Sequence, residues 1–83
     1  MSDLASFQRT LDLYSAAAYW NYLDANNESE HLATEMRERA AAAGASSGQL
    51  IDAEQYARDC VSNGRKPRLA GYSFPHFRKE ALR

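Results

Sequence analysis

Apolar side chains recur at steps of three and four residues over residues 3–23, and this pattern constrains the fold more than any other feature. The first stripe consists of Leu4, Phe7, Leu11, Tyr14 and Ala18. A second stripe consists of Leu13, Ala16, Ala17, Trp20 and Leu23. Such spacing is typical of an α-helix, and Ser2 or Asp3 can cap its first turn. Because the two stripes cover most of the circumference of its later half, this helix is expected to lie between two other helices or beneath another chain.

A second helix is expected from about residue 28 to residue 43, after a turn-like break at residues 24–27. Asn27 and Glu30 have the spacing of a capping box at its start. Its apolar face is narrow and consists of Leu32, Met36, Ala40 and Ala43. Gly44 fits the positive-φ position that commonly ends helices. This helix therefore has little apolar area to bury.

A third helix is expected to begin at Asp52, because Asp52 and Gln55 have the spacing of a capping box and Ile51 with Tyr56 that of a hydrophobic staple. Residues 45–48 then form a flexible connector. The apolar stripe of this helix consists of Ala53, Tyr56, Ala57, Cys60 and Val61, and Asn63-Gly64 provides the stop. Cys60 is interpreted as a small buried apolar residue, not as a reactive thiol.

These patterns predict an all-α fold with three main helices in a single domain. A short fourth helix near the carboxyl end is an option, because Pro75 can occupy a first helical turn. No run of alternating apolar and polar residues indicates a sheet. At 83 residues the chain has room for one modest core and no deep substrate cavity.

The charge divides the chain into two parts. Residues 1–63 form an acidic helical body with ten acidic and four basic side chains, a balance of −6. Residues 64–83 form a basic, aromatic segment of the same domain, with one acidic and six basic side chains, a balance of +5. Two surfaces of opposite sign affect the choice of partner and the rate of encounter more than they affect the fold.

The basic segment allows three interpretations. It contains the aromatic residues Tyr72, Phe74 and Phe77 and the cations Arg65, Lys66, Arg68, Arg78 and Lys79. Its aromatic side chains can fold back over the Trp20 region while its cations pair with the acidic body. The segment can instead dock on a protein partner. It can also bind nucleic acid, with cations on phosphates and aromatic rings stacked on unpaired bases.

Carboxylates gather along the second expected helix. They are Glu28, Glu30, Glu35 and Glu38, and Asp24 lies in the turn that precedes this helix. Regularly spaced carboxylates can occupy a cationic groove on a partner, including a groove that binds nucleic acid. The alternative is a solvated helix face in which Glu35 and Arg39 form an ordinary pair four residues apart.

The sequence offers little support for catalysis or for a metal site. Glu28 and His31 have the three-residue spacing found in di-iron bundles, with Glu35 a further turn along, but the chain has only one copy of this motif. Local spacing does not bring Cys60 beside His31 or His76 as nucleophile and base. We therefore expect no metal, no cofactor and no enzymatic activity.

The function that these features favour is binding. We expect a small regulator or inhibitor that masks a surface on a larger protein or complex, one that handles nucleic acid being an option. Its anchors are the aromatic cluster of Tyr14, Tyr19, Trp20 and Tyr22 or the segment from Tyr72 to Phe77, since aromatic side chains often dominate interface energetics. The alternatives are a nucleic-acid-binding accessory protein that uses the basic segment, and a homo-oligomer with Trp20 at its seam.

The cytoplasm is the expected location. The amino terminus shows no positively charged leader followed by an apolar run. No stretch approaches the roughly 20 apolar residues needed to span a bilayer. We therefore expect no membrane partner. A small phage protein that blocks a host complex would suit this size, although no motif indicates one.

Overall fold

The protein folds into three α-helices, as the sequence predicts. The structure is a computed structural model that describes the backbone of residues 3–69 and the side chains of residues 6–69. Helix α1 spans Asp3–Leu23, α2 spans Asn27–Ala42 and α3 spans Ser47–Ser62. The all-α fold class is confirmed, and residues 3–69 contain no strand. The optional fourth helix near Pro75 lies outside the described residues.

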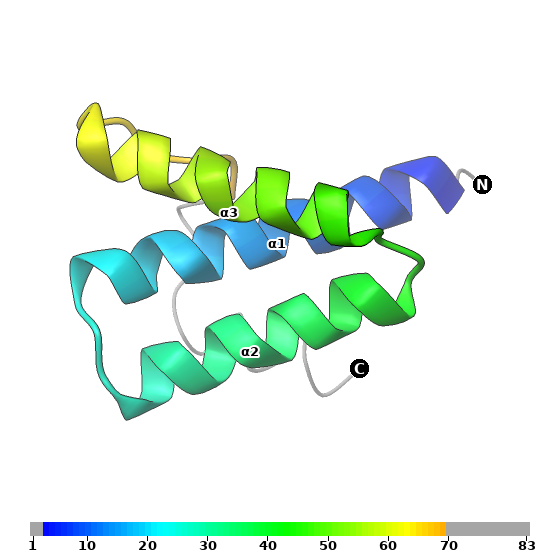
Figure 1. Cartoon of the computed structure of the whole chain (residues 1–83), viewed down its shortest axis with the longest axis horizontal. Helices are drawn as coiled ribbons and strands as arrows, with labels where there is room; N and C mark the ends of the chain where they lie inside the picture. Colours follow the sequence, from blue (N-terminus) through cyan, green and yellow to red (C-terminus); the bar gives the residue numbers. More distant parts are fainter. Residues whose placement is uncertain (1–2, 70–83) are drawn as a thin grey trace.

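Helix α1 is the central helix of the bundle. Helix α2 runs antiparallel to α1, and α3 returns in the same direction as α1 (Figure 1). Helix α1 packs extensively against both α2 and α3, whereas α2 and α3 have few contacts with each other. The prediction that the first helix lies between two others is therefore confirmed.

The core is densest around the middle of α1, where all seven residues from 13 to 19 are buried. Four of them, residues 15–18, are serine or alanine, and such small side chains let neighbouring helices approach closely. The buried Ser15 hydroxyl donates a hydrogen bond of 2.9 Å to the Ala53 carbonyl of α3. This hydrogen bond offsets the cost of removing the hydroxyl from water. Leu23 departs from the predicted second stripe: it is 50% exposed, because it is the last residue of α1 at the end of the bundle.

Helix α2 begins one residue earlier than predicted. Its N-cap is Asn26, whose side chain accepts from the Ser29 backbone N–H at 2.9 Å, while the Ser29 hydroxyl accepts from the Asn26 N–H at 2.9 Å. The prediction of Asn27 with Glu30 is therefore wrong. Ser29 is fully buried and its hydroxyl also donates to the Asn21 side chain of α1 at 2.8 Å, which ties this cap to the core.

The apolar stripe of α2 is shorter than predicted. Leu32, Met36 and Ala40 are buried, but Ala43 is the exposed C-cap residue. Gly44 then takes a φ of +108°, which confirms its predicted role at the helix end. Three side chains therefore supply the apolar anchoring of this helix.

Helix α3 begins well before the predicted start at Asp52. The Ser46 hydroxyl accepts from the Gln49 N–H at 3.2 Å, and the Gln49 side chain accepts from the Ser46 N–H at 2.9 Å. This earlier capping box brings Leu50 into the buried stripe. Residues 47–48 are consequently helical and not part of a flexible connector, and Ile51, the predicted staple residue, is 63% exposed.

The buried face and the end of α3 match the prediction. Ala53, Ala57 and Cys60 are buried, and Tyr56 and Val61 pack at the margin of the core. The helix ends at Ser62 with Asn63 as its C-cap, and Gly64 follows with a φ of +65°.

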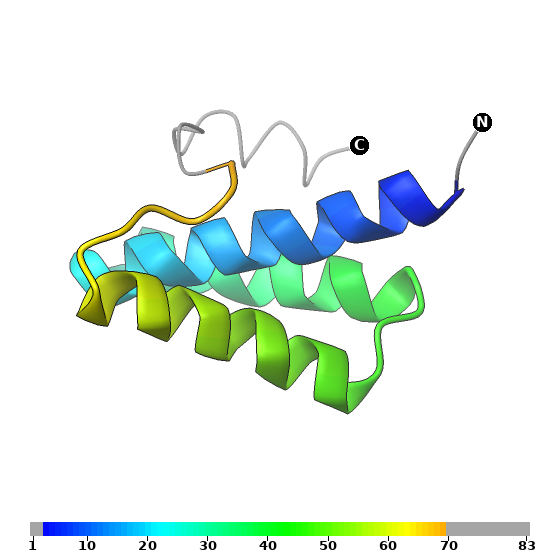
Figure 2. The same cartoon turned by 90° about the horizontal axis from the view of Figure 1, so that it is seen from above.

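Residues 64–69 turn back from the end of α3 toward α1 (Figure 2). The Arg65 N–H donates to the Cys60 carbonyl at 2.9 Å, and Pro67 is buried. Leu69 has a φ of +63° and packs against the core. The first part of the basic segment therefore belongs to the folded body.

Candidate functional site

A polar network joins α1 to α3 at the carboxyl-terminal half of α1. The Tyr22 hydroxyl donates to Glu54 Oε1 at 2.8 Å, and Arg58 Nη2 donates to the same oxygen at 2.9 Å. Arg58 Nε donates to the Tyr22 oxygen at 3.0 Å, and its guanidinium lies 5.4 Å from the centre of the Tyr22 ring. Tyr14 approaches the second Glu54 oxygen at 3.4 Å. This network clamps the two helices together.

The electrostatics of the network keep each group in its ordinary charge state at neutral pH. The hydrogen bond from Tyr22 lowers the pKa of the Glu54 carboxyl below its usual value, and the nearby Arg58 charge acts in the same direction. Burial raises the pKa of the Tyr14 hydroxyl, and the charge of Glu54 raises it further. Burial likewise raises the pKa of Tyr22. The ionised Glu54 carboxylate thus accepts hydrogen bonds from two neutral tyrosine hydroxyls of α1 and from the Arg58 guanidinium, and these bonds link α1 to α3.

The four aromatic residues predicted as an anchor cluster differ in exposure. Tyr14 and Tyr19 are buried, Trp20 is half-buried, and Tyr22 is 37% exposed. The Tyr19 and Trp20 rings meet edge to face with their centres 5.7 Å apart. Tyr19 thus contributes to the core, and of the four only Tyr22 presents an exposed side chain.

The turn between α1 and α2 combines exposed apolar and acidic side chains. We call this surface the acidic turn, and its members are Tyr22, Leu23, Asp24, Glu28 and Glu30. All five are exposed. Tyr22 and Leu23 are two of the three large apolar side chains that are exposed among the described residues. This end of the bundle therefore exposes two apolar and three acidic side chains within nine consecutive residues.

The other predicted carboxylates lie further along the outer face of α2. Glu38 is exposed, and Glu35 Oε1 lies 2.6 Å from His31 Nε2. Glu35 is thus engaged with His31, one turn before it. No group of three histidine, cysteine or acidic side chains comes together within the described part of the chain, so the Glu28 and His31 motif is not joined there by further metal ligands.

The predicted cations divide into two kinds. Arg65 and Lys66 are exposed at the end of α3. Arg68 instead contacts the body: its Nε lies 3.2 Å from Asp12 Oδ1, and its guanidinium lies 5.3 Å from the centre of the Tyr56 ring. The remaining predicted residues lie outside the described range, and they are Tyr72, Phe74, Phe77, Arg78 and Lys79.

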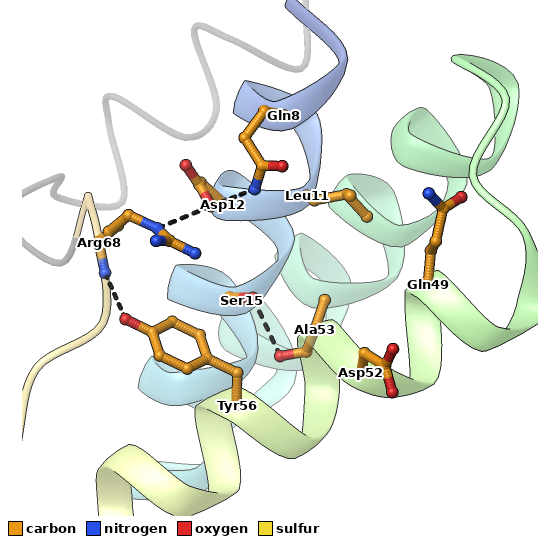
Figure 3. A pocket seen from close by; sticks show the side chains of 9 residues that line it. All are labelled: Gln8, Leu11, Asp12, Ser15, Gln49, Asp52, Ala53, Tyr56 and Arg68. Carbon is orange, nitrogen blue, oxygen red and sulfur yellow. Dashed lines mark hydrogen bonds and ion pairs between the residues drawn. The ribbon is translucent and has the colours of Figure 1, made fainter. Parts of the chain in front are cut away.

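A groove lies between the amino-terminal halves of α1 and α3 (Figure 3). It is open to solvent and has a volume of about 310 Å³. Its lining consists of Gln8, Leu11, Asp12, Ser15, Gln49, Asp52, Ala53, Tyr56 and Arg68. Arg68 and Tyr56 lie at one end, and Gln49 and Asp52 lie at the other. Local sequence patterns do not indicate this groove, because its two walls are about forty residues apart along the chain.

Comparisons with known proteins assign no family. No protein-family model, no curated protein and no solved structure matches the chain. Among the described residues, no helix combines the length and the apolar character needed to cross a bilayer.

Proposed function

We propose that the protein is a small non-catalytic binding module that uses the acidic turn to mask a basic surface on a larger protein. One observation carries this proposal: two large apolar side chains, Tyr22 and Leu23, are exposed at the end of α1, and the exposed Asp24, Glu28 and Glu30 follow within eight residues. Aromatic and aliphatic anchors within a charged rim are the arrangement that protein interfaces use. The expected partner surface has an apolar pocket surrounded by lysine or arginine.

The charge of the acidic turn would assist encounter with such a partner. Glu28 and Glu30 lie in the first turn of α2, where carboxylates also complement the positive end of the helix dipole. Carboxylates at an exposed rim speed association with a cationic surface and affect the equilibrium affinity less. Binding should therefore weaken as salt rises, with most of the change in the association rate.

The turn is also held in one conformation before any partner arrives. Buried Ser29 accepts from the Asn26 N–H and donates to the Asn21 side chain, and these bonds fix the path from α1 to α2. The Tyr22 hydroxyl is held by Glu54 and Arg58. A preformed surface loses less conformational entropy on binding than a flexible one.

Affinity capture with surface variants tests this proposal. The tagged full chain is incubated with nuclease-treated extract of the cells that make it, and bound proteins are quantified by mass spectrometry. A protein that binds through the acidic turn should be recovered about tenfold less with Leu23→Ser, because the variant removes an interface anchor. Glu30→Lys should also reduce recovery, and the reduction should be larger at low salt.

Matched controls separate the acidic turn from general surface effects. Ile51→Ser removes a similarly exposed apolar side chain at the other end of the bundle, and Asp59→Lys reverses an exposed charge on α3. Both controls should retain the partner. Equal losses from controls and acidic-turn variants, or retention by all of them, would contradict the proposal.

Nucleic-acid binding is the second candidate function, and the exposure of Arg65 and Lys66 supports it. Arg68 supports it less, since Asp12 already balances its charge. Phosphate binding by this end would fall steeply with salt and would be lost in an Arg65→Glu, Lys66→Glu variant. Anisotropy of labelled single-stranded and duplex DNA with that variant and with Glu30→Lys distinguishes the two functions. We keep the cytoplasm as the proposed compartment for either function.

A further inference from the structure

We propose that the groove between α1 and α3 is a second binding site, which accepts an arginine side chain from a partner polypeptide. Its residues are separate from those of the acidic turn, so this inference does not depend on the function proposed above. The chain itself provides the precedent, because Arg68 already places a guanidinium against the rim of this groove.

The contacts of Arg68 show how the groove recognises a guanidinium. Asp12 supplies the carboxylate at 3.2 Å, and its side chain is only 15% exposed, which limits screening of the charge by solvent. Tyr56 supplies a ring 5.3 Å from the guanidinium carbon. A carboxylate and an aromatic ring are the two partners that favour arginine over lysine, because only the planar guanidinium both stacks and forms directed hydrogen bonds.

Arg68 fills this site incompletely. Its side chain is 65% exposed, and only Nε of its five N–H donors forms a side-chain hydrogen bond within the described residues. An exposed ion pair that is held by one hydrogen bond contributes little to the free energy of unfolding. An incoming arginine can therefore compete with Arg68 at modest cost.

The charge of the groove favours a further cation. The lining contains two carboxylates, those of Asp12 and Asp52, and one guanidinium, that of Arg68. Its net charge is therefore −1. Asp52 is exposed at the end opposite Arg68 and forms no ion pair with any residue from 6 to 69. An arginine entering from that end would meet Asp52 first and Tyr56 next.

The dimensions of the groove restrict its occupant to one or two side chains. A volume of about 310 Å³ is at the lower limit for small-molecule pockets. Half-buried Leu11 and buried Ala53 offer an apolar floor for the methylene groups of an arginine. Phosphate groups would be repelled by Asp52, so a basic polypeptide suits the groove and nucleic acid does not.

NMR titration of the ¹⁵N-labelled full chain tests this inference. The probe is a short glycine-rich peptide with two arginines, compared with the same peptide carrying lysine or neutral citrulline in their place. The arginine peptide should shift the amide signals of Gln49, Asp52 and Tyr56. The lysine peptide should bind more weakly, and the citrulline peptide should leave these signals in place.

Two variants move the affinity in opposite directions if the inference is correct. Asp52→Asn should weaken binding of the arginine peptide about threefold or more, because it removes a carboxylate that has no ion-pair partner among residues 6–69. Arg68→Gln should strengthen binding about two- to fivefold, because it frees Asp12. Asp59→Asn, on α3 but outside the groove, should leave the affinity unchanged.

Three results would overturn the inference. They are equal binding of the arginine and citrulline peptides, shifts confined to residues outside the groove, and an unchanged affinity in Asp52→Asn. The spectrum of each free variant reports whether it is folded. If Arg68→Gln alters the fold, then Asp52→Asn and the citrulline peptide decide the outcome.

Discussion

Helices α1 and α2 bury their side chains in different ways. In α1, every residue from 13 to 19 is buried, whereas α2 buries one narrow stripe of Leu32, Met36 and Ala40 together with Ser29. The central helix is enclosed because it packs on both neighbours. The outer helix retains a charged face toward solvent. The contacts of α1 with both neighbours are therefore expected to determine most of the stability, whereas α2 is held by a single narrow stripe.

The largest expected effect tests the anchoring of α2. Met36 is fully buried, so Met36→Ala should lower the free energy of unfolding by about 2–5 kcal/mol. Urea unfolding followed by circular dichroism measures this change. Ile51→Ala should alter stability by less than about 0.5 kcal/mol, since Ile51 is on the surface. A small effect of Met36→Ala would mean that the stripe does not hold α2 in place.

A second substitution tests the enclosure of α1. Ala16 is fully buried, so a larger side chain has no space there. Ala16→Leu should lower the free energy of unfolding by about 1–3 kcal/mol through overpacking. Ala41→Leu, on the exposed side of α2, is the matched control and should be nearly neutral. If Ala16→Leu is tolerated equally well, α1 is not enclosed as described.

A third, smaller effect tests the start of α2. Asn26→Ala should cost about 1 kcal/mol, because it removes the side chain that caps the Ser29 N–H. Asn27→Ala should have little effect, because Asn27 is already within the helix. Thermal unfolding of the two variants in parallel gives the comparison. An equal or larger loss of stability in Asn27→Ala would indicate that Asn27 caps the helix, as the sequence predicts.

The smallest effect concerns pH and the network between α1 and α3. The pKa of Glu54 is lowered from its ordinary 4.5 in the folded protein. A lowered pKa contributes stability that is present above pH 4.5 and is lost as pH falls through the folded value. Glu54→Gln should therefore be less stable than the wild type at neutral pH, and the gap should narrow below pH 4.5. Urea midpoints across this range would show a constant gap if the carboxylate made no such contribution.

Periodicity predicted that the helices exist but did not locate all of their ends. Two residue pairs near the start of α3 have the spacing of a capping box. They are Ser46 with Gln49 and, six residues later, Asp52 with Gln55. The first is used because it brings Leu50 into the buried stripe. The choice depends on packing against α1, which local spacing does not contain.

The candidate surfaces were predicted only in part, because local spacing does not show which distant segments come into contact. The carboxylates of α2 could be identified because they share one segment. The contact between Arg68 and Asp12 joins residues 56 positions apart, and Tyr22 and Glu54 are 32 apart. The four-residue spacing of Glu54 and Arg58 is that of neighbours on one helix. It gave no sign that both would meet a tyrosine of α1.

Native-state hydrogen exchange of the free protein measures whether stability is concentrated in the enclosed part of α1. The amides of residues 13–19 should exchange only through global unfolding, with protection equal to the full free energy of unfolding. The amides of the first turns of α2 should exchange faster, through local opening. Equal or greater protection of α2 would show that stability is not concentrated in α1.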